Sequence, residues 1–228
     1  MKYLILSTVF TVFCFAFFGN ASQADEKGYF YTRENAKGKI VHVHFMGPAN
    51  WLASQHAEDS NLHRLSDLNS LTLNQHTLSE GEMRYVASLE AVVELEIGLL
   101  PDEVEVPSGV LRPLGNMKSL NSLSVSANGL TDEDFAFLVE LSNLKDFTVF
   151  GDSTLSDNVI WKLSELKNLQ TLNLKGRFSD AAIASLVIHR NLVELNIDSP
   201  LMTERALDAV SLLPKLKKLN GKVIEVHH

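Results

Sequence analysis

A short apolar pattern recurs at a nearly constant step along most of this chain. Three apolar residues, at the first, fourth and sixth places, begin at residues 40, 68, 92, 120, 144, 169 and 192, and a partial copy with Gly221 at its sixth place begins at 216. Successive starts lie 23 to 28 residues apart. Such periods are typical of solenoids, in which each unit is one supersecondary element and stacked neighbours share a continuous core. The chain is therefore predicted to fold as a stack of about eight units.

Five of the units also carry the start signal of a helix. An apolar residue is followed by Ser or Thr and then by an acid, and the spacing places the next apolar residues on one side. The Ser or Thr oxygen can accept from a free backbone N–H of the first turn, and the acid meets the positive end of the helix dipole. The instances are Leu78-Ser79-Glu80, Leu130-Thr131-Asp132, Leu155-Ser156-Asp157, Phe178-Ser179-Asp180 and Met202-Thr203-Glu204.

The unit that begins at Val92 lacks this signal. Pro101, Pro107 and Pro113 interrupt it, and proline breaks a helix because it lacks an N–H and clashes with the preceding turn. An irregular convex loop is expected between Leu99 and Gly115.

These residues resemble the leucine-rich-repeat family, in its variety of about 24 residues with a full helix. The resemblance covers Ile40 to about Gly221, and it implies an α/β solenoid with a curved parallel sheet on the concave face and helices on the convex face. It also implies a role in protein recognition, and similar repeats are common in exported bacterial proteins. One departure is that the asparagine often found just after the strand is clear only at Asn128.

The first residues have the composition of a secretion signal. Lys2 precedes an apolar run, and small residues up to Ala24 suit cleavage. We therefore expect a signal peptide at 1–24, an N-terminal leader or cap at 25–39 and the repeat domain at 40–228, with an exported product in the periplasm or outside the cell. An uncleaved membrane anchor is the alternative. Cys14, the single cysteine, would leave with the signal, so disulfides and thiolate metal sites are not expected.

Charge restricts the class of partner. The whole chain carries a net charge of −8, with 28 acidic and 20 basic residues. Binding to nucleic acid needs a basic face, and adsorption to anionic lipid needs basic clusters, so neither partner is expected. No membrane association is expected after cleavage of the signal.

The strand pattern also predicts the side chains on the concave face, since alternate residues point to opposite sides. Eight strands about 4.8 Å apart make a face roughly 34 Å long. Small and acidic groups dominate, and the last copy adds Lys218, Asn220 and Lys222. The predicted ligand-binding residues are Ser70, Thr72, Asn74, Glu94, Glu96, Ser122, Ser124, Ser126, Asp146, Thr148, Phe150, Thr171, Asn173, Lys175, Glu194, Asn196 and Asp198.

The sequence favours a non-catalytic module that binds a protein partner, although no motif identifies that partner. Cell-envelope polysaccharide or another glycan is the alternative, suggested by the Ser, Thr and Asn side chains. A simpler interpretation is that these are solvated strand residues.

His42 and His44 are weak candidates for a metal site because an H-x-H pair on a strand shares one face. No catalytic motif is present and no cofactor is expected. Glu94 and Glu96 share a strand face but lack an aromatic-lined cleft, so a glycosidase is not expected.

Overall fold

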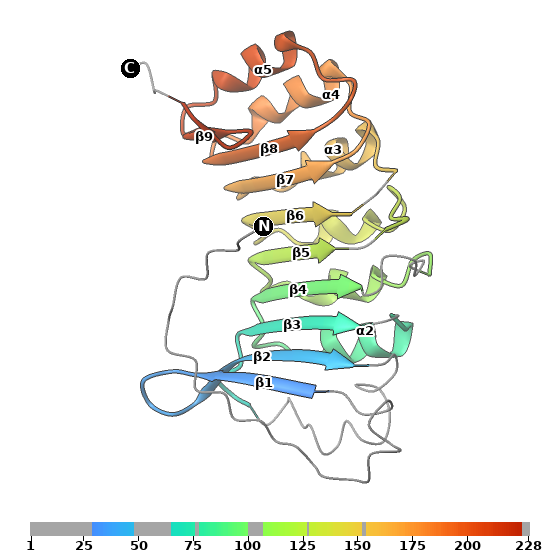
Figure 1. Cartoon of the computed structure of the whole chain (residues 1–228), viewed down its shortest axis with the longest axis vertical. Coiled ribbons are helices and arrows are strands. Elements are labelled where there is room, and N and C mark those ends of the chain that lie inside the picture. The colour runs from blue at the N-terminus through green and yellow to red at the C-terminus, as the bar shows by residue number, and fades with distance from the viewer. Residues whose placement is uncertain are drawn as a thin grey trace, which may run out of the picture.

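The computed structural model describes residues 29–47, 65–75, 78–99, 107–126, 128–151 and 154–224. The predicted signal peptide at 1–24 lies outside these residues. Within them the chain forms one sheet of ten strands, whose order in space follows their order in sequence. Figure 1 shows the strands stacked one above another, with the helices on one side of the sheet.

The repeated apolar pattern forms the parallel strands of this sheet. Strands β2 to β9 pair in parallel, each with the next. The predicted α/β solenoid is therefore confirmed. The strands are β2 (Ile40–Gly47), β3 (Ser70–Gln75), β4 (Glu94–Leu99), β5 (Ser122–Ser126), β6 (Asp146–Phe150), β7 (Thr171–Lys175), β8 (Glu194–Asp198) and β9 (Lys218–Leu219).

Helical segments return the chain from one strand to the next. The α-helices are α2 (Glu80–Ala87), α3 (Asp157–Leu163), α4 (Asp180–Ser185) and α5 (Glu204–Ser211). The 3-10 helices are η3 (Arg112–Asn116), η4 (Ala136–Glu140) and η5 (Leu186–Ile188). Ser79 and Glu82 form the expected capping box at α2. Ser156 and Ser179 also accept bonds from the first turns of α3 and α4, whereas Thr203 makes no such bond.

Two units have no α-helix after their strand, one where an irregular loop was expected and one where an α-helix was expected. The unit of Val92 has the 3-10 helix η3 in the described part of its predicted irregular loop, and residues 100–106 lie outside the description. After Thr131 the chain forms turns and then η4, so the predicted α-helix is wrong there. The apolar side chains Phe135, Leu138 and Leu141 are spaced by three, and a 3-10 helix aligns residues at that spacing on one face.

Both ends of the sheet add antiparallel strands that the repeat period does not predict. Strand β1 (Tyr29–Glu34) pairs with β2. At the other end, β10 (Lys222–Val223) folds back on β9 through a turn in which Asn220 has φ 48° and Gly221 has φ 74°. Asn-Gly favours this hairpin turn because both residues tolerate positive φ. The prediction that Lys222 continues the last parallel strand is therefore wrong.

Side-chain hydrogen bonds join the start of one helix to the start of the next. The carboxylate of Asp157 accepts from the backbone N and from Oγ of Ser179, at 2.7 and 2.6 Å. Asp132 accepts in the same way from Ser156, and Asp180 from Thr203. The acid of each helix start thus also ties its repeat to the following one.

Asparagines make a second set of links at the entrance to the strands. The side-chain amides of Asn143, Asn168 and Asn191 each donate to a backbone carbonyl of the preceding repeat, at 2.7 to 3.2 Å. These residues therefore fix neighbouring repeats to each other on the side opposite the helix starts.

The core between sheet and helices is a continuous stack of aliphatic and aromatic side chains. It includes Phe45, Phe135, Phe147 and Phe178, each with no exposed surface. The ring of Phe135 contacts that of Phe147 edge-on, with centroids 5.6 Å apart. Among the described residues, no helix has the length and apolar character needed to cross a membrane.

Candidate binding face

The concave face consists of the strand side chains that point away from the core. On β5, Leu123 and Val125 are buried, while Ser122, Ser124 and Ser126 point outward. The alternation repeats on β6, β7 and β8, and the parallel register aligns these outward side chains in rows across the sheet. The structure thus places the predicted residues on one common face.

The predicted ligand-binding residues differ in how far their side chains are exposed. Ser70 and Thr72 are only 8% and 7% exposed, because side chains of the neighbouring strands cover them. The exposed members are Glu94, Glu96, Ser126, Phe150, Lys175 and Asp198. Half-buried members are Asn74, Ser122, Ser124, Asp146, Thr148, Thr171, Asn173, Glu194 and Asn196. Apart from the half-buried Asn74 on β3, the accessible predicted residues therefore lie on β4 and the strands that follow it.

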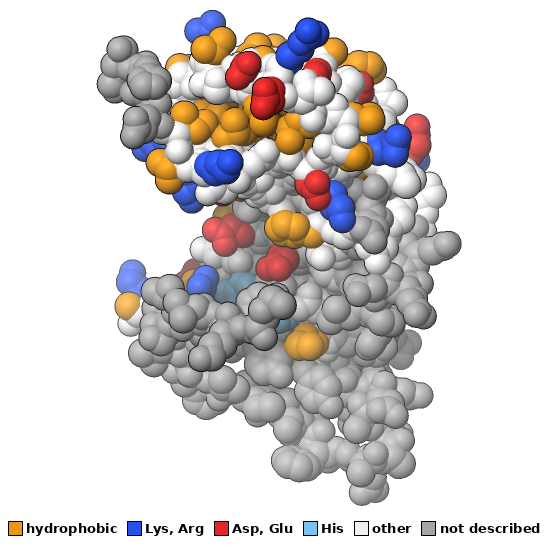
Figure 2. Space-filling view, turned by 45° about the horizontal axis from the view of Figure 1, so that its top comes forward, with side chains coloured by type: hydrophobic (Ala, Val, Ile, Leu, Met, Phe, Trp, Pro, Cys, Tyr) orange, Lys and Arg blue, Asp and Glu red, His pale blue; other side chains and the backbone are white. Residues whose placement is uncertain are grey.

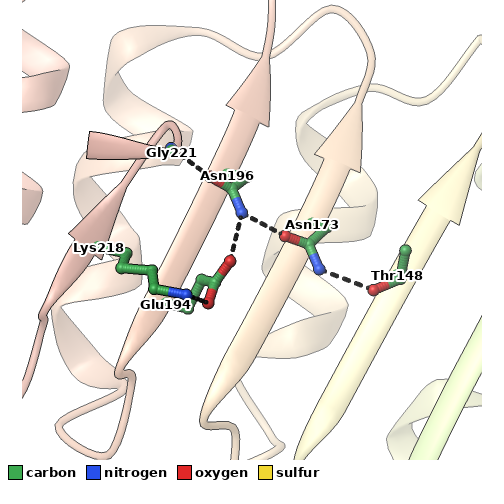
Figure 3. Close-up of polar contacts among 6 residues, drawn as sticks. All are labelled: Thr148, Asn173, Glu194, Asn196, Lys218 and Gly221. Carbon is green, nitrogen blue, oxygen red and sulfur yellow. Dashed lines mark hydrogen bonds and ion pairs between the residues drawn. The ribbon is translucent and has the colours of Figure 1, made fainter. Parts of the chain in front are cut away.

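The C-terminal part of the face forms a hydrogen-bonded ladder. Asn173 donates its side-chain amide to Oγ1 of Thr148 at 2.8 Å, and Asn196 donates to Oδ1 of Asn173 at 2.6 Å (Figure 3). The backbone N of Gly221 then donates to Oδ1 of Asn196 at 2.9 Å. These amides are already engaged with one another, which leaves them fewer hydrogen bonds for a ligand.

Glu194 lies beside this ladder and is paired within the chain. Its carboxylate is 3.0 Å from Nζ of Lys218 and also accepts from Asn196, as Figure 3 shows. The Lys218 ammonium, followed by the Asn196 amide, lowers the pKa of Glu194 below its ordinary value. The charge of this acid is therefore balanced locally, and a surface pair of this kind contributes little net stability.

The two candidate metal ligands lie on β2 and contact side chains of β3. Nδ1 of His42 is 2.8 Å from Oγ of Ser70, and Nε2 of His44 is 2.8 Å from the amide nitrogen of Asn74. Within the described residues, no three His, Cys, Asp or Glu side chains are grouped as a metal site would require. The described geometry thus lends no support to metal binding by this pair.

Burial favours the neutral form of both histidines. It lowers the pKa of His42, and the charges of Arg33 and His44 lower it further. Burial also lowers the pKa of His44, against the opposing effect of Glu96. Arg33 lies directly across the β1–β2 pair from His42. The sequence did not indicate this neighbour, because β1 lies outside the repeat period.

The middle of the face, from β4 to β6, has a different composition. Ser122, Ser124 and Ser126 form its floor, with Glu94 and Glu96 on one side and Asp146 on the other. Phe150 stands at its edge with 54% of its surface exposed. Figure 2 shows acidic side chains and histidines in the hollowed part of the molecule. This region can offer carboxylates, small hydroxyls and one aromatic ring to a ligand.

Comparison with known proteins gives likenesses of structure only. No protein-family model and no curated protein matches the sequence. A solved internalin C2 from Listeria monocytogenes aligns with a TM-score of 0.48 and 20% identity, over 69% of this chain and 63% of that one. A second internalin from that bacterium aligns with a TM-score of 0.35 and 19% identity, over 69% of this chain and 62% of that one.

A plant structure also aligns with the chain. It is the LRR ectodomain of a membrane receptor kinase from Arabidopsis thaliana, solved in complex with CASPARIAN STRIP INTEGRITY FACTOR 2. It aligns with a TM-score of 0.41 and 14% identity, over 88% of this chain and 29% of that one. The matched region spans less than two thirds of each of the three solved chains. The architecture of the present chain therefore rests on its own repeats, strand register and burial pattern.

Proposed function

We propose that this leucine-rich-repeat solenoid is an exported, non-catalytic module that binds a protein partner through its concave face. The observation that carries the proposal is the alignment of outward side chains in rows across eight parallel strands. Such rows form an extended surface on a scaffold whose repeats are fixed to one another, and solenoids commonly bind on such surfaces. The export part rests on the apolar start of the chain from Met1 to Ala24.

The character of the face favours protein over glycan. Glycan binding usually relies on exposed aromatic platforms, and Phe150 is the one large aromatic exposed on this face among the side chains described on β2 to β9. The amides that suggested glycan binding are also engaged with one another, as between Asn196 and Asn173. A protein partner needs fewer free amides, since its affinity comes mainly from a few anchors and from charge complementarity.

Affinity capture with two matched variants tests the proposal. Ser124→Trp fills the floor of the concave face, and Asn158→Trp places the same bulk on the exposed surface of helix α3. We expect the immobilised wild type and Asn158→Trp to retain the same protein from the native envelope fraction, and Ser124→Trp to lose it. Thermal unfolding of all three proteins establishes that each is folded.

Two outcomes of this experiment would contradict the proposal. Equal retention by Ser124→Trp and the wild type would contradict binding on the concave face. Absence of a captured protein, together with retention on a glycan array, would replace the protein partner by a polysaccharide.

A further inference from the structure

Three carboxylates surround the serine floor at the middle of the concave face. The strand register places Ser122 between Glu94 on β4 and Asp146 on β6. Neighbouring strands lie about 4.8 Å apart, so the backbones of Glu94 and Asp146 are roughly 10 Å from each other. Glu94 and Glu96 are two residues apart on one strand, which separates them by about 6.6 Å. The three acids thus lie close together on one face, two on the same strand and the third two strands away.

Within the described residues, none of Glu94, Glu96 and Asp146 takes part in an ion pair, whereas Glu194 on β8 is paired with Lys218. The neighbouring histidines are no substitute, because burial lowers the pKa of His42 and His44 and leaves both rings neutral at pH 7. The carboxylates therefore maintain a negative potential over the floor of the face.

An exposed aromatic ring lies on the same face as the acids. Phe150 lies directly across from Ser126 of β5, whose small side chain leaves space next to the ring. A Lys or Arg head group is attracted to the face of such a ring, and its aliphatic stem can cover apolar surface. The ring therefore offers a contact suited to the same cationic side chains as the carboxylates.

The size of the face indicates how a partner lies on it. Strands of five residues are about 16 Å long, so a face roughly 34 Å in length covers about 500 Å². This is less than the roughly 800 Å² per partner that globular proteins usually bury in a stable interface. An extended segment fits the available area better than a folded domain does.

We propose that the middle of the concave face binds an extended, basic segment of a protein partner, with Lys or Arg side chains at Glu94, Glu96 and Asp146 and against Phe150. This inference rests on the proposed function and specifies the chemistry of the partner. Alternate residues of an extended chain are about 6.6 Å apart, which matches the separation of Glu94 and Glu96. A Lys-x-Lys or Arg-x-Arg sequence is therefore the simplest ligand.

The test uses a short synthetic peptide of alternating Lys and Ser, labelled for fluorescence anisotropy, and its counterpart with Glu in place of Lys. Binding is measured at an ionic strength of about 0.15 M, where the Debye length is about 8 Å and distant charges are screened. We expect the Lys peptide to bind and the Glu peptide not to bind. The triple variant Glu94→Gln/Glu96→Gln/Asp146→Asn should lower the affinity about tenfold, and Phe150→Ala severalfold.

A matched control separates local recognition from the overall acidity of the protein. Glu133→Gln/Glu165→Gln/Asp208→Asn removes the same charge from exposed positions outside the sheet and should leave the affinity unchanged within about twofold. Equal losses in the two triple variants would overturn the inference. So would failure of the Lys peptide to bind the wild type, even if Ser124→Trp abolishes partner capture and the proposed function stands.

A second copy of this chain is the other occupant that the test must identify. Lys215, Lys217 and Lys218 make its C-terminal end basic. Sedimentation of the wild type and of Glu94→Gln/Glu96→Gln/Asp146→Asn distinguishes the cases. A monomer in both agrees with a separate partner. A wild-type dimer that dissociates in the variant would overturn the inference and assign the acidic surface to self-association.

Discussion

His189 is a buried polar residue in a position where other repeats have an apolar one. Ten residues after the helix start, Leu89, Leu141, Leu166 and Leu213 are all buried, and His189 takes their place with 1% of its surface exposed. Its Nδ1 is 3.1 Å from the carbonyl of Leu166, and a carbonyl only accepts, so Nδ1 carries the proton. Nε2 has no hydrogen-bond partner among the described residues. The repeat therefore contains a destabilising acceptor inside its core.

The charge of His189 links stability to pH. Burial lowers its pKa below the ordinary value of 6.5, the Leu166 carbonyl opposes this, and the nearby Lys167 charge lowers it further. Above about pH 7 the folded and unfolded forms are both neutral, and pH has no effect through this group. Below about 6.5 the unfolded chain takes up a proton that the folded chain resists, so stability falls towards the lowered folded pKa.

The substitution His189→Leu should remove both the unsatisfied acceptor in the core and the dependence of stability on pH through this residue. We expect the free energy of unfolding to rise by about 1–3 kcal/mol, because an unsatisfied buried acceptor is lost and the repeat regains its usual leucine. The gain should be larger near pH 5 than near pH 8, as measured by urea unfolding at both values. His42 and His44 also titrate, but they are present in both proteins and cancel in the difference. A gain of equal size at the two pH values would show that His189 does not titrate on unfolding.

At the scale of elements, the helix starts serve two purposes. In α4, Ser179 accepts from the backbone N of Ala182 at 3.2 Å, which satisfies a free donor of the first turn. The same hydroxyl donates to Asp157 of α3, and so does the backbone N of Ser179. The acid that sits favourably at the positive end of one helix thus holds the cap of the next. Neighbouring repeats are coupled in this way beyond the apolar contacts of their core.

Asp157→Ala should show how much this link contributes. The change leaves the backbone N of Ser179 without its acceptor, so we expect a loss of about 1–3 kcal/mol in the free energy of unfolding. Asn158→Ala is the control, because this adjacent residue of α3 is exposed. Urea unfolding of the two variants should differ clearly. If they match, the carboxylate bridge contributes no measurable coupling between the repeats.

At the scale of the whole molecule, the repeat period predicted the parallel sheet and the common direction of its outward side chains. It did so because the positions after Leu68, Val92 and Leu120 alternate between core and surface in the same way in each unit. Strand β1 was missed because it has no repeat and gains its place by pairing with β2. The type of helix after Thr131 was also mistaken, since a spacing of three fits both α and 3-10 helices.

Local pattern could not predict which part of the concave face is accessible. The exposure of Ser70 and Thr72 depends on larger side chains two dozen or more residues away, such as His42, whose ring contacts Ser70. The engagement of Asn173 with Thr148 likewise depends on the register of β6 and β7. The exposure and the hydrogen bonds of these side chains depend on how the repeats stack. For this reason the sequence predicted the whole concave face as the site, whereas the proposal made from the structure concerns its acidic middle.

The most direct test of the proposed function compares the two large aromatic residues of opposite faces. Phe150 on the concave face and Trp161 on α3 are 54% and 55% exposed, so a photo-reactive benzoylphenylalanine at either position is equally accessible. On illumination in the native envelope fraction, we expect the reagent at Phe150 to form a covalent adduct of discrete mass with a protein, and the reagent at Trp161 to form none. An adduct at Trp161 alone, or at neither position, would contradict recognition of a protein through the concave face.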